Sequence, residues 1–336
     1  MIHKNNQKGM RRSMQVGLTM IELMVSLVIS VVIALAAATA YLGTRSTATA
    51  IASVSSLNET GNLTLEMIGR DIQMAGYFPA ILSTGNTMGQ YTNIKGTPAG
   101  WVANTPTAYA QGIFGCDGAL FDPVTMLCGA TVAGAPDTIV VNYFAATELN
   151  PAQFTSGFDC LRQDVSNDPD NAGRVPTLPE IISNRYSLSA LQTYVTQGVG
   201  QATRNVSSRS LACNGNGLTT ENTIYQPIYE GLVDMVISYG ANDGAGTLSP
   251  TRYRTAAQIN ALPLVNGVGG WQRVTSVRVC VLSRTTDNVR TEDVAGSLRT
   301  YTDCRGNTPT YAITDRTIYK RFERIFAVRN NLNGVY

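Results

Sequence analysis

The sequence is poor in the residues that carry most enzyme chemistry. Histidine occurs once in 336 residues, as His3, and beyond residue 17 lysine occurs only as Lys95 and Lys320. The rest of the chain therefore cannot use Ser-His-Asp or Cys-His catalysis or hold a histidine-ligated metal. It also has no Gly-x-x-x-x-Gly-Lys phosphate loop and no dinucleotide-binding fingerprint. An enzyme that uses only carboxylates stays open as a class, but no motif points to one. We expect no catalytic residue, no cofactor and no metal site.

The charge is unevenly distributed, although the formal net charge is only +2. The first 17 residues contain no acid and four basic residues: Lys4, Lys8, Arg11 and Arg12. Subtracting those 4 from 25 leaves 21 basic against 23 acidic residues, a net charge of −2 for the remaining chain. A nearly neutral body does not indicate a polyanion-binding surface, so no nucleic acid binding is expected.

Six cysteines lie in polar, loop-like surroundings, and none forms a Cys-x-x-Cys pair. This spacing excludes the common zinc and thioredoxin-like sites. An even number of cysteines behind a targeting segment indicates an oxidising compartment and three disulfides, with six buried free thiols as the alternative. Fifteen pairings are formally open. We prefer pairing between neighbours in the sequence: Cys116–Cys128, Cys160–Cys213 and Cys280–Cys304.

Residues 18–42, LTMIELMVSLVISVVIALAAATAYL, are the one long apolar run, without Lys, Arg, Pro or Gly. As a helix these 25 residues span roughly 37 Å, more than the ~30 Å hydrocarbon core of a bilayer. The basic residues before the run should stay in the cytoplasm and the body should lie outside it. Glu22 is the anomaly, because a carboxylate in a bilayer costs roughly 2.5–3.5 kcal/mol. Taken alone, it could sit at the depth of the headgroups.

The stretch Gly17-Leu-Thr-Met-Ile-Glu-Leu23 resembles the processing site of type IV prepilins, usually written G-F-T-L-I-E-L. The resemblance implies that a prepilin peptidase cuts between Gly17 and Leu18 and methylates the new N-terminus. It also implies that Glu22 pairs with the α-amine of a neighbouring subunit in the filament. The alternative is an ordinary secretory signal cleaved after ALAAATA, residues 34–40. A long apolar run that contains Glu22 argues against that alternative.

Residues 43–75 turn polar but keep a helical rhythm. Apolar or small residues recur every three or four positions, at Ile51, Val54, Leu57, Gly61, Leu65, Ile68, Ile72 and Ala75. Glu66 and Arg70 form an i,i+4 pair on the wetter side, and Gly76 with Pro79 should end the helix. Residues 18–75 can therefore be one helix, or two with a break at Gly43.

The remaining chain reads mostly as strands and loops. Strands are predicted at residues 137–144, 232–239, 271–282 and 317–329, whereas 83–136 reads as loops with short strands and 150–217 as an irregular insertion. Asp164, Asp168 and Asp170 lack the EF-hand spacing and indicate a solvated acidic loop rather than a calcium site. The fold class is α+β. A long N-terminal helix, transmembrane and then amphipathic, packs on a mostly antiparallel sheet with loop insertions.

We divide the chain into four parts on this basis. A cleaved leader covers residues 1–17 and a transmembrane or filament-core helix 18–42. An amphipathic continuation into the head covers 43–76, and a disulfide-containing β-rich head covers 77–336.

The end of the predicted N-terminal helix indicates which group of type IV pilins the sequence resembles. Residues 65–77, LEMIGRDIQMAGY, resemble the L…R-x-A-G-Y pattern of PilW-type minor pilins, with Gln73 in place of the usual Arg. Residues 229–240, 274–285 and 319–332 are similar to the distal sheet of the same proteins. The resemblance implies a non-enzymatic minor pilin that primes type IV pilus growth in a tip complex. Its implied partners are the prepilin peptidase, other minor pilins, the major pilin, the inner-membrane assembly platform and a tip adhesin.

The implied location is the inner membrane, with the head in the periplasm, before assembly and the extracellular pilus tip afterwards. A mature chain of 319 residues, 336 minus 17, is bulky for a subunit stacked at every position of a filament. The alternatives are a pseudopilin of a type II secretion system and, from another class, a secreted binding protein or enzyme with a cleaved signal.

Overall fold

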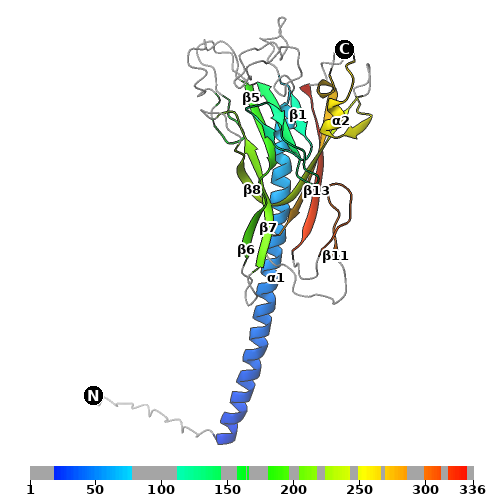
Figure 1. Ribbon diagram of the computed structural model, residues 1–336. Helices are drawn as coiled ribbons and strands as arrows, with labels where there is room; N and C mark the ends of the chain where they lie inside the picture. Colours follow the sequence, from blue (N-terminus) through cyan, green and yellow to red (C-terminus); the bar gives the residue numbers. More distant parts are fainter. Residues whose placement is uncertain are drawn as a thin grey trace, which may run out of the picture. The chain divides into compact units, whose positions relative to one another are not determined.

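The computed structural model describes residues 19–77, 112–144, 157–163, 165, 181–196, 204–217, 224–242, 249–265, 269–285, 299–311 and 317–330. By its contacts the chain divides into two compact units, Met1–Thr49 and Ala50–Tyr336. The first unit contains the N-terminal part of helix α1, and the second contains the rest of α1 and the whole sheet (Figure 1). Among the candidate site residues named above, Gly17, Leu18, Asp164, Asp168 and Asp170 lie outside the described residues.

Helix α1 runs from Met20 to Met74, which confirms the predicted long N-terminal helix. It continues through Gly43, where a break was considered. It ends at Gly76, whose φ of 70° lies in the left-handed region that a helix-terminating glycine adopts. The Gly76 amide then donates to the carbonyl of Asn142, 2.8 Å away, so the end of the helix is tied to the sheet.

The predicted apolar stripe of α1 is buried from Leu57 onward. Leu57, Leu65 and Ile68 are at most 3% exposed, and Ile72 and Ala75 are fully buried. Burying one such aliphatic side chain contributes roughly 1.5–3 kcal/mol, so the stripe accounts for much of the attachment of this helix to the head. Ile51, which we placed on the same stripe, is 66% exposed, because no described part of the head covers that turn.

A nine-stranded sheet forms the head, and every pair of neighbouring strands is antiparallel. Its order is β1-β4-β5-β7-β8-β10-β13, with β6 paired to β7 and β9 paired to β8. The bounds are β1 Ile113–Cys116, β4 Thr138–Phe144, β5 Ile181–Leu188, β6 Gln192–Thr196, β7 Arg204–Asn214, β8 Gln226–Ala241, β9 Arg252–Arg254, β10 Val274–Arg284 and β13 Tyr319–Ala327. The α+β class, with an N-terminal helix on an antiparallel sheet, is confirmed.

The head also contains several smaller elements of secondary structure. Two hairpins form separate two-stranded sheets, β2 Phe121–Asp122 with β3 Leu127–Cys128 and β11 Arg299–Thr300 with β12 Thr310–Tyr311. A short helix α2, Ala256–Asn260, begins in a capping box formed by Thr255 and Gln258, and a 3-10 turn covers Trp271–Arg273. The strand predicted at 271–282 therefore begins only at Val274, because its first three residues form this turn.

The description of residues 150–217 as an irregular insertion is wrong. This range contains β5 and β7, two inner strands of the sheet, and also β6. The alternating apolar pattern is missing because many of the buried side chains are polar and hydrogen-bonded instead. Ser183, Asn184 and Arg185 of β5 are at most 1% exposed. The Arg185 guanidinium donates to Asn214 of β7 at 2.6 Å, which satisfies part of this buried polar layer.

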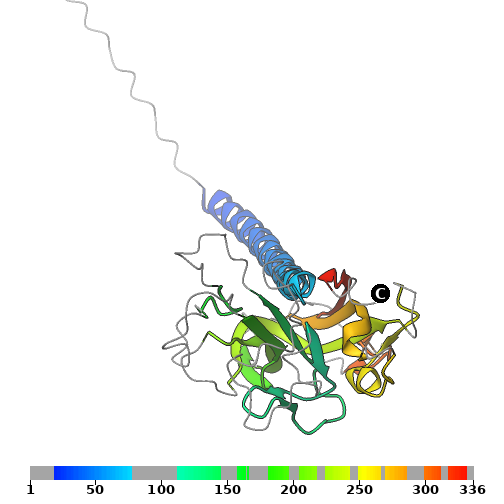
Figure 2. The same ribbon diagram turned by 90° about the horizontal axis from the view of Figure 1, so that it is seen from above.

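Neighbouring strand residues assign the two faces of the sheet. Tyr186 reaches α1, since its hydroxyl donates to Asp71 at 2.6 Å. Its neighbour Arg185 therefore points to the opposite face, where its guanidinium lies 6.0 Å from the ring centre of Phe121. Helix α1 thus covers one face and the β2–β3 hairpin covers part of the other. Figure 2 shows α1 on one side of the sheet within the head.

Three disulfides pin loops and hairpins to the sheet: Cys116–Cys128, Cys160–Cys213 and Cys280–Cys304. This is the pairing between sequence neighbours that we preferred. Cys213 lies opposite Tyr186 in the β5–β7 register, so the loop at 157–163 is held on the face that α1 covers. Cys280 alternates with Val281, which lies opposite Phe322, so the β11–β12 hairpin is held on the other face.

Candidate functional site

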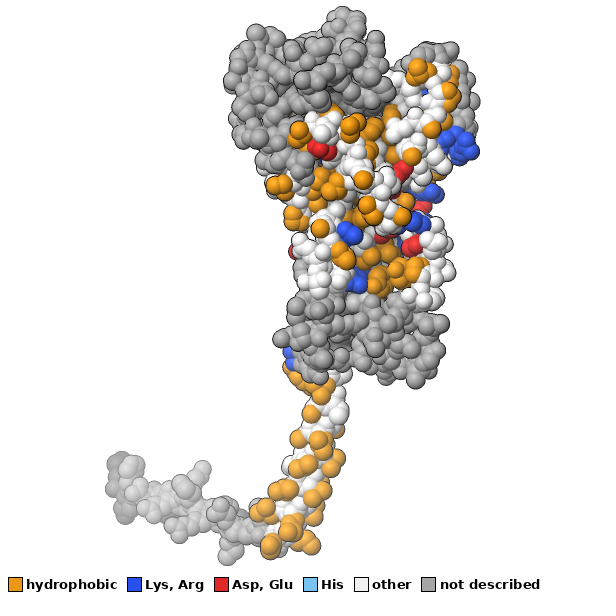
Figure 3. Space-filling view, in the orientation of Figure 1, with side chains coloured by type: hydrophobic (Ala, Val, Ile, Leu, Met, Phe, Trp, Pro, Cys, Tyr) orange, Lys and Arg blue, Asp and Glu red, His pale blue; other side chains and the backbone are white. Residues whose placement is uncertain are grey.

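The N-terminal part of α1 is an apolar rod that no residue described by the structure covers. Its side chains from Met20 to Arg45 are all exposed, and the helix contains a stretch apolar and long enough to cross a membrane. Figure 3 shows hydrophobic side chains around this part of the helix. Soluble proteins rarely leave so large an apolar surface uncovered, so it must contact lipid or other protein chains.

Glu22 sits in the first turn of this rod and takes part in a local cap. Its carboxylate accepts from the Thr19 amide at 3.0 Å and from the Thr19 hydroxyl at 2.9 Å, while the Glu22 amide lies 3.4 Å from the same hydroxyl. Thr-x-x-Glu with these reciprocal contacts is a capping box, which satisfies amide groups that a helix start leaves without partners. The cap gives Glu22 a structural role within the chain itself, beside the predicted pairing with a neighbour's α-amine.

The head-bound part of α1 packs through two glycines on one helix face. A Cβ added to Gly61 would lie 2.5 Å from the ring of Phe322, and one added to Gly69 would lie 2.0 Å from the ring of Phe326. Both rings belong to β13, are buried and face the helix. Since no side chain intervenes at Gly61 or Gly69, the helix backbone approaches β13 closely.

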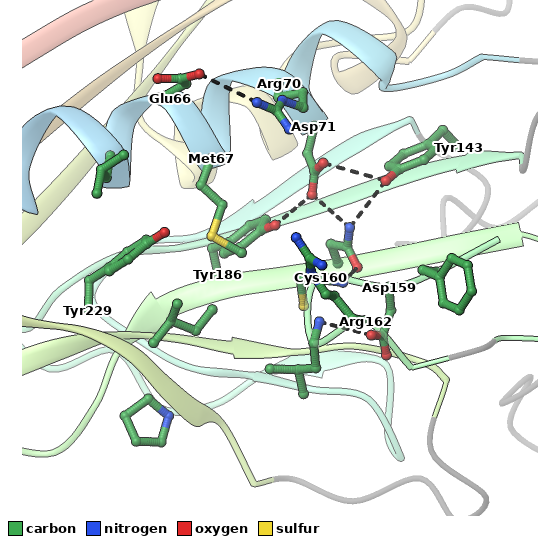
Figure 4. A pocket seen from close by; sticks show the side chains of 16 residues that line it. Glu66, Met67, Arg70, Asp71, Tyr143, Asp159, Cys160, Arg162, Tyr186 and Tyr229 are labelled. Atoms are coloured by element: carbon green, nitrogen blue, oxygen red, sulfur yellow. Dashed lines mark hydrogen bonds and ion pairs between the residues drawn. The ribbon is translucent and has the colours of Figure 1, made fainter.

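A buried polar cluster fixes the same part of α1 to the middle of the sheet. Asp71 accepts from the Tyr186 hydroxyl and from the Asn184 amide, both at 2.6 Å, and from the Tyr143 hydroxyl at 3.4 Å. The Asn184 amide also donates to the Tyr143 hydroxyl at 3.3 Å. Figure 4 shows the Asp71 carboxylate pointing from the helix into this cluster. Donors from β4 and β5 thus meet one acceptor on α1, which fixes the rotation and height of the helix.

The electrostatics of the cluster are dominated by burial. Burial raises the pKa of Asp71, against the hydrogen bonds from Tyr186, Asn184 and Tyr143 and the nearby Arg70, which favour the carboxylate. Burial, followed by the neighbouring Asp71 charge, raises the pKa of Tyr186 and Tyr143. Both tyrosines therefore stay protonated and act as donors at any physiological pH.

Sequence reasoning missed this cluster. An acid bordering the apolar stripe of an amphipathic helix, as Asp71 borders Ile68 and Ile72, is a signal for a buried partner. The partners themselves could not be named, because β5 was read as a loop. Glu66 and Arg70, which were predicted to pair, lie 3.4 Å apart with both side chains mostly exposed.

A cleft of about 660 Å³ opens beside the cluster. One wall is α1, the floor carries Asn184 and Tyr186, and the other wall combines the disulfide-held loop 157–163 with the start of β8 at 227–229. All of these belong to the second unit. Among the residues that the structure describes, no three of His, Cys, Asp or Glu gather closely enough to hold a metal ion.

Comparisons with known proteins point to the same class as the sequence motifs. Residues 194–330 match the family model for type IV pilus-assembly protein W, PilW. No curated protein matches the chain as a whole or in part. A type IV-like pilin from Thermus thermophilus resembles it at 10% identity, over 82% of this chain and 97% of that one, but the TM-score of 0.32 is too low for a conclusion about the fold.

The match confirms the predicted resemblance to the PilW family, and it covers β7, β8, β10 and β13. Three of these strands, β8, β10 and β13, overlap the segments 229–240, 274–285 and 319–332 that resemble the distal sheet of PilW-type pilins, whereas residues 65–77 lie outside the match. Together with the exposed apolar helix, the match over residues 194–330 fits a pilus-related, membrane-anchored pilin.

Proposed function

We propose that this chain, similar to the PilW family over residues 194–330, is a minor pilin that primes type IV pilus growth in a tip complex with other minor pilins. The observation that carries the proposal is the division of α1. One part is apolar and uncovered, as a membrane or filament-core helix must be, and the other is locked to a head. A type II secretion pseudopilin needs the same anchor, and the match to a pilus-assembly family favours the pilus.

The four parts named above would then act in order. A prepilin peptidase removes residues 1–17, and residues 18–42 hold the chain in the inner membrane with the head in the periplasm. The assembly platform then transfers this segment from lipid into the filament core, where it packs on the same segment of other pilins. The segment 43–76 carries the head, 77–336, to the outside.

Glu22 would exchange partners during this transfer. In the chain as it stands its carboxylate caps the helix through Thr19. Cleavage before Leu18 would create a positively charged α-amine near the same helix start, on this subunit and on each neighbour. A carboxylate on an apolar helix entering a protein core needs such a cationic partner, because an unpaired buried charge is strongly destabilising.

An initiating role is supported by the head. Loops and hairpins extend from both faces of the sheet and are held there by three disulfides. Such a head is wide for a repeated shaft position but has room at one end of a filament. At this end of the filament the chain would contact the other minor pilins, the major pilin and a tip adhesin.

The first experiment tests processing. N-terminal mass spectrometry of the protein from cells with an active prepilin peptidase should find a chain that begins at Leu18 with a methylated amine. A chain beginning at Tyr41 would identify an ordinary signal peptide, and an intact Met1 would exclude processing. Either result would refute the proposal that the chain is a pilin.

The second experiment tests the initiating role. Sheared filaments should contain far less of this chain than of the major subunit, and deletion of the gene should lower the number of pili more than it changes their composition. A near-equal ratio of the two subunits, or an unchanged number of functional pili in the deletion strain, would contradict initiation.

A further inference from the structure

The cleft beside Asp71 is built to keep its shape. In the loop that forms one wall, the Asp159 carboxylate accepts from the amides of Leu161, Gln163 and Gly217 at 2.8–2.9 Å. The loop is also bonded to β7 by the Cys160–Cys213 disulfide, and the Cys160 amide donates to Asn184 at 2.8 Å. The volume of about 660 Å³ lies within the range of roughly 300–1,000 Å³ typical of small-ligand pockets.

Arg162 in this loop occupies an unfavourable backbone conformation. Its φ of 59° lies in the left-handed region, where residues other than glycine are uncommon. Its side chain is exposed and lines the cleft opposite α1. Figure 4 shows Arg162 on the loop side of the cleft and Arg70 on the helix side. A glycine would relieve this conformation, so an arginine here indicates a use for its side chain.

Two classes of ligand do not fit this lining. A metal ion finds no free carboxylate at Asp71 on the helix wall or at Asp159 on the loop, because Asp71 accepts from three side chains and Asp159 from three amides. An anion finds no excess of positive charge, since the lining holds two arginines, Arg70 and Arg162, against three acids, Glu66, Asp71 and Asp159. A purely apolar ligand would cover the polar floor of Asn184 and Tyr186.

What remains is a neutral ligand that is apolar on one side and rich in hydroxyl groups at its edge. Aromatic rings of Tyr143, Phe158 and Tyr229 line the cleft, and aromatic faces pack well on the C–H face of a sugar ring. The exposed Glu66–Arg70 pair on α1 and Arg162 on the opposite wall place acceptors and donors on both sides of the cleft. A sugar hydroxyl both donates and accepts, so it can bond to each of them.

We propose that the cleft between α1, the loop 157–163 and the start of β8 binds one or two rings of a neutral carbohydrate. Tyr229 supplies the stacking surface, and Arg162 and the Glu66–Arg70 pair bond to the hydroxyl groups. This site is additional to the assembly role proposed above and does not depend on it.

Saturation-transfer difference NMR on the full chain tests the proposal. The chain is held in a zwitterionic detergent, since glycoside detergents would compete for the cleft. The probes are the methyl glycosides of glucose, galactose, mannose and N-acetylglucosamine with their β-linked disaccharides, and a set of acetylated tripeptides. At least one saccharide should bind with a Kd of about 1 mM or tighter. Saturation of no saccharide, or of the peptides alone, overturns the proposal.

Arg162→Gly separates binding from folding. The variant should unfold at the same or a higher temperature, since glycine suits the positive φ, and yet bind the saccharide at least about tenfold more weakly. Tyr229→Ala should cause a similar loss. Arg324→Ala removes an exposed arginine from β13, outside the cleft, and should change nothing. Equal affinity in Arg162→Gly, Tyr229→Ala and the unaltered chain would show that the saccharide binds elsewhere and would also overturn the proposal.

Discussion

The two parts of helix α1 are one helix built for two environments. Between Met20 and Leu42 most side chains are apolar and all are exposed, and Glu22 is capped by a contact three residues away. Between Ala50 and Met74 only one stripe is apolar, and it is buried against the sheet. Asp71 is also buried there, and its partners lie 72 to 115 residues away in sequence. In the first part the structure leaves the partners to be supplied by lipid or other chains. In the second part the same chain supplies them.

This difference predicts that stability and assembly can be separated by mutation. Changes in the head-bound part of α1 or in the disulfides should alter the free energy of unfolding of the head. Changes in the apolar part should leave the head stable and act on membrane insertion or filament formation. Each of the following experiments tests whether stability and assembly respond separately to mutation.

The largest effect on stability is expected from the Cys160–Cys213 disulfide. It closes the longest loop, with a sequence separation of 53 against 24 and 12 for the other two. Chain-entropy arguments give a loss of about 4 kcal/mol for the Cys160→Ser/Cys213→Ser variant and about 3 kcal/mol for Cys116→Ser/Cys128→Ser. Denaturant unfolding under non-reducing conditions measures both. Equal or reversed losses would show that loop closure does not govern the stability of the head.

Asp71→Ala should cost roughly 2–4 kcal/mol, because it leaves the donors on Tyr186, Asn184 and Tyr143 buried without their common acceptor. Glu66→Ala, one helical turn away, removes an exposed carboxylate and should cost less than about 0.5 kcal/mol. Thermal unfolding of the two variants provides the comparison. Similar stability in both would mean that the Asp71 cluster does not hold the helix.

The pH dependence of stability should also be confined to the head. Burial raises the pKa of Asp137 from 3.8 to about 6, although its oxygens accept from the amides of Gly118 and Ile237. The folded state therefore binds a proton more tightly than the unfolded state between pH 3.8 and about 6. In this window the unfolding free energy should fall as the pH rises, by up to roughly 3 kcal/mol from this group.

Asp137→Asn isolates that contribution. The difference in unfolding free energy between pH 4 and pH 7 should be smaller in the variant than in the unaltered chain, even though the variant is less stable at both. An unchanged difference would assign the pH dependence to other groups, such as Asp71 and Asp234, whose pKa burial also raises.

The smallest effect on the free energy of unfolding is expected from a glycine-to-alanine substitution, which can be compared in both parts of the helix. Gly69→Ala forces a methyl group into the ring of Phe326 and should cost about 1–3 kcal/mol, partly offset by the better helix propensity of alanine. A Cβ at Gly43 meets nothing within 4 Å, so Gly43→Ala should leave the unfolding of the head unchanged. Equal effects would mean that the two parts of α1 are not energetically distinct.

The sequence predicted the elements whose burial is apolar. Helix α1 and the strands β4, β8, β10 and β13 carry periodic apolar residues, and their predicted ends differ from the structure by at most three residues, except that β8 begins six residues before the predicted strand. Strands β5 and β7 were missed because serine, asparagine and arginine fill them, and such residues are buried only where hydrogen-bond partners exist. These partners come from distant strands, as Asn214 does for Arg185.

The candidate sites differ in the same way in how far the sequence could predict them. Gly17, Leu18 and Glu22 form one short continuous motif, so they could be named from the sequence, and their roles stay predictions. The Asp71 cluster and the cleft combine α1, β4, β5 and the start of β8, and no local pattern announces such a combination. Arg162 was not singled out, since a positive φ is set by its loop and not by the residue type.

Glu22→Gln tests the central claim most directly, because glutamine can still close the capping box with Thr19 but has no charge to pair with an α-amine. Pili are counted by electron microscopy on cells that carry Glu22→Gln, with Glu66→Gln on the head-bound part of the helix as the matched control. We expect Glu22→Gln to be processed, to retain its disulfides and to insert into the membrane, but to support few or no pili, whereas Glu66→Gln should support normal numbers. Normal piliation with Glu22→Gln would show that this carboxylate only caps its own helix and would contradict the division of α1 into an assembly part and a head-bound part.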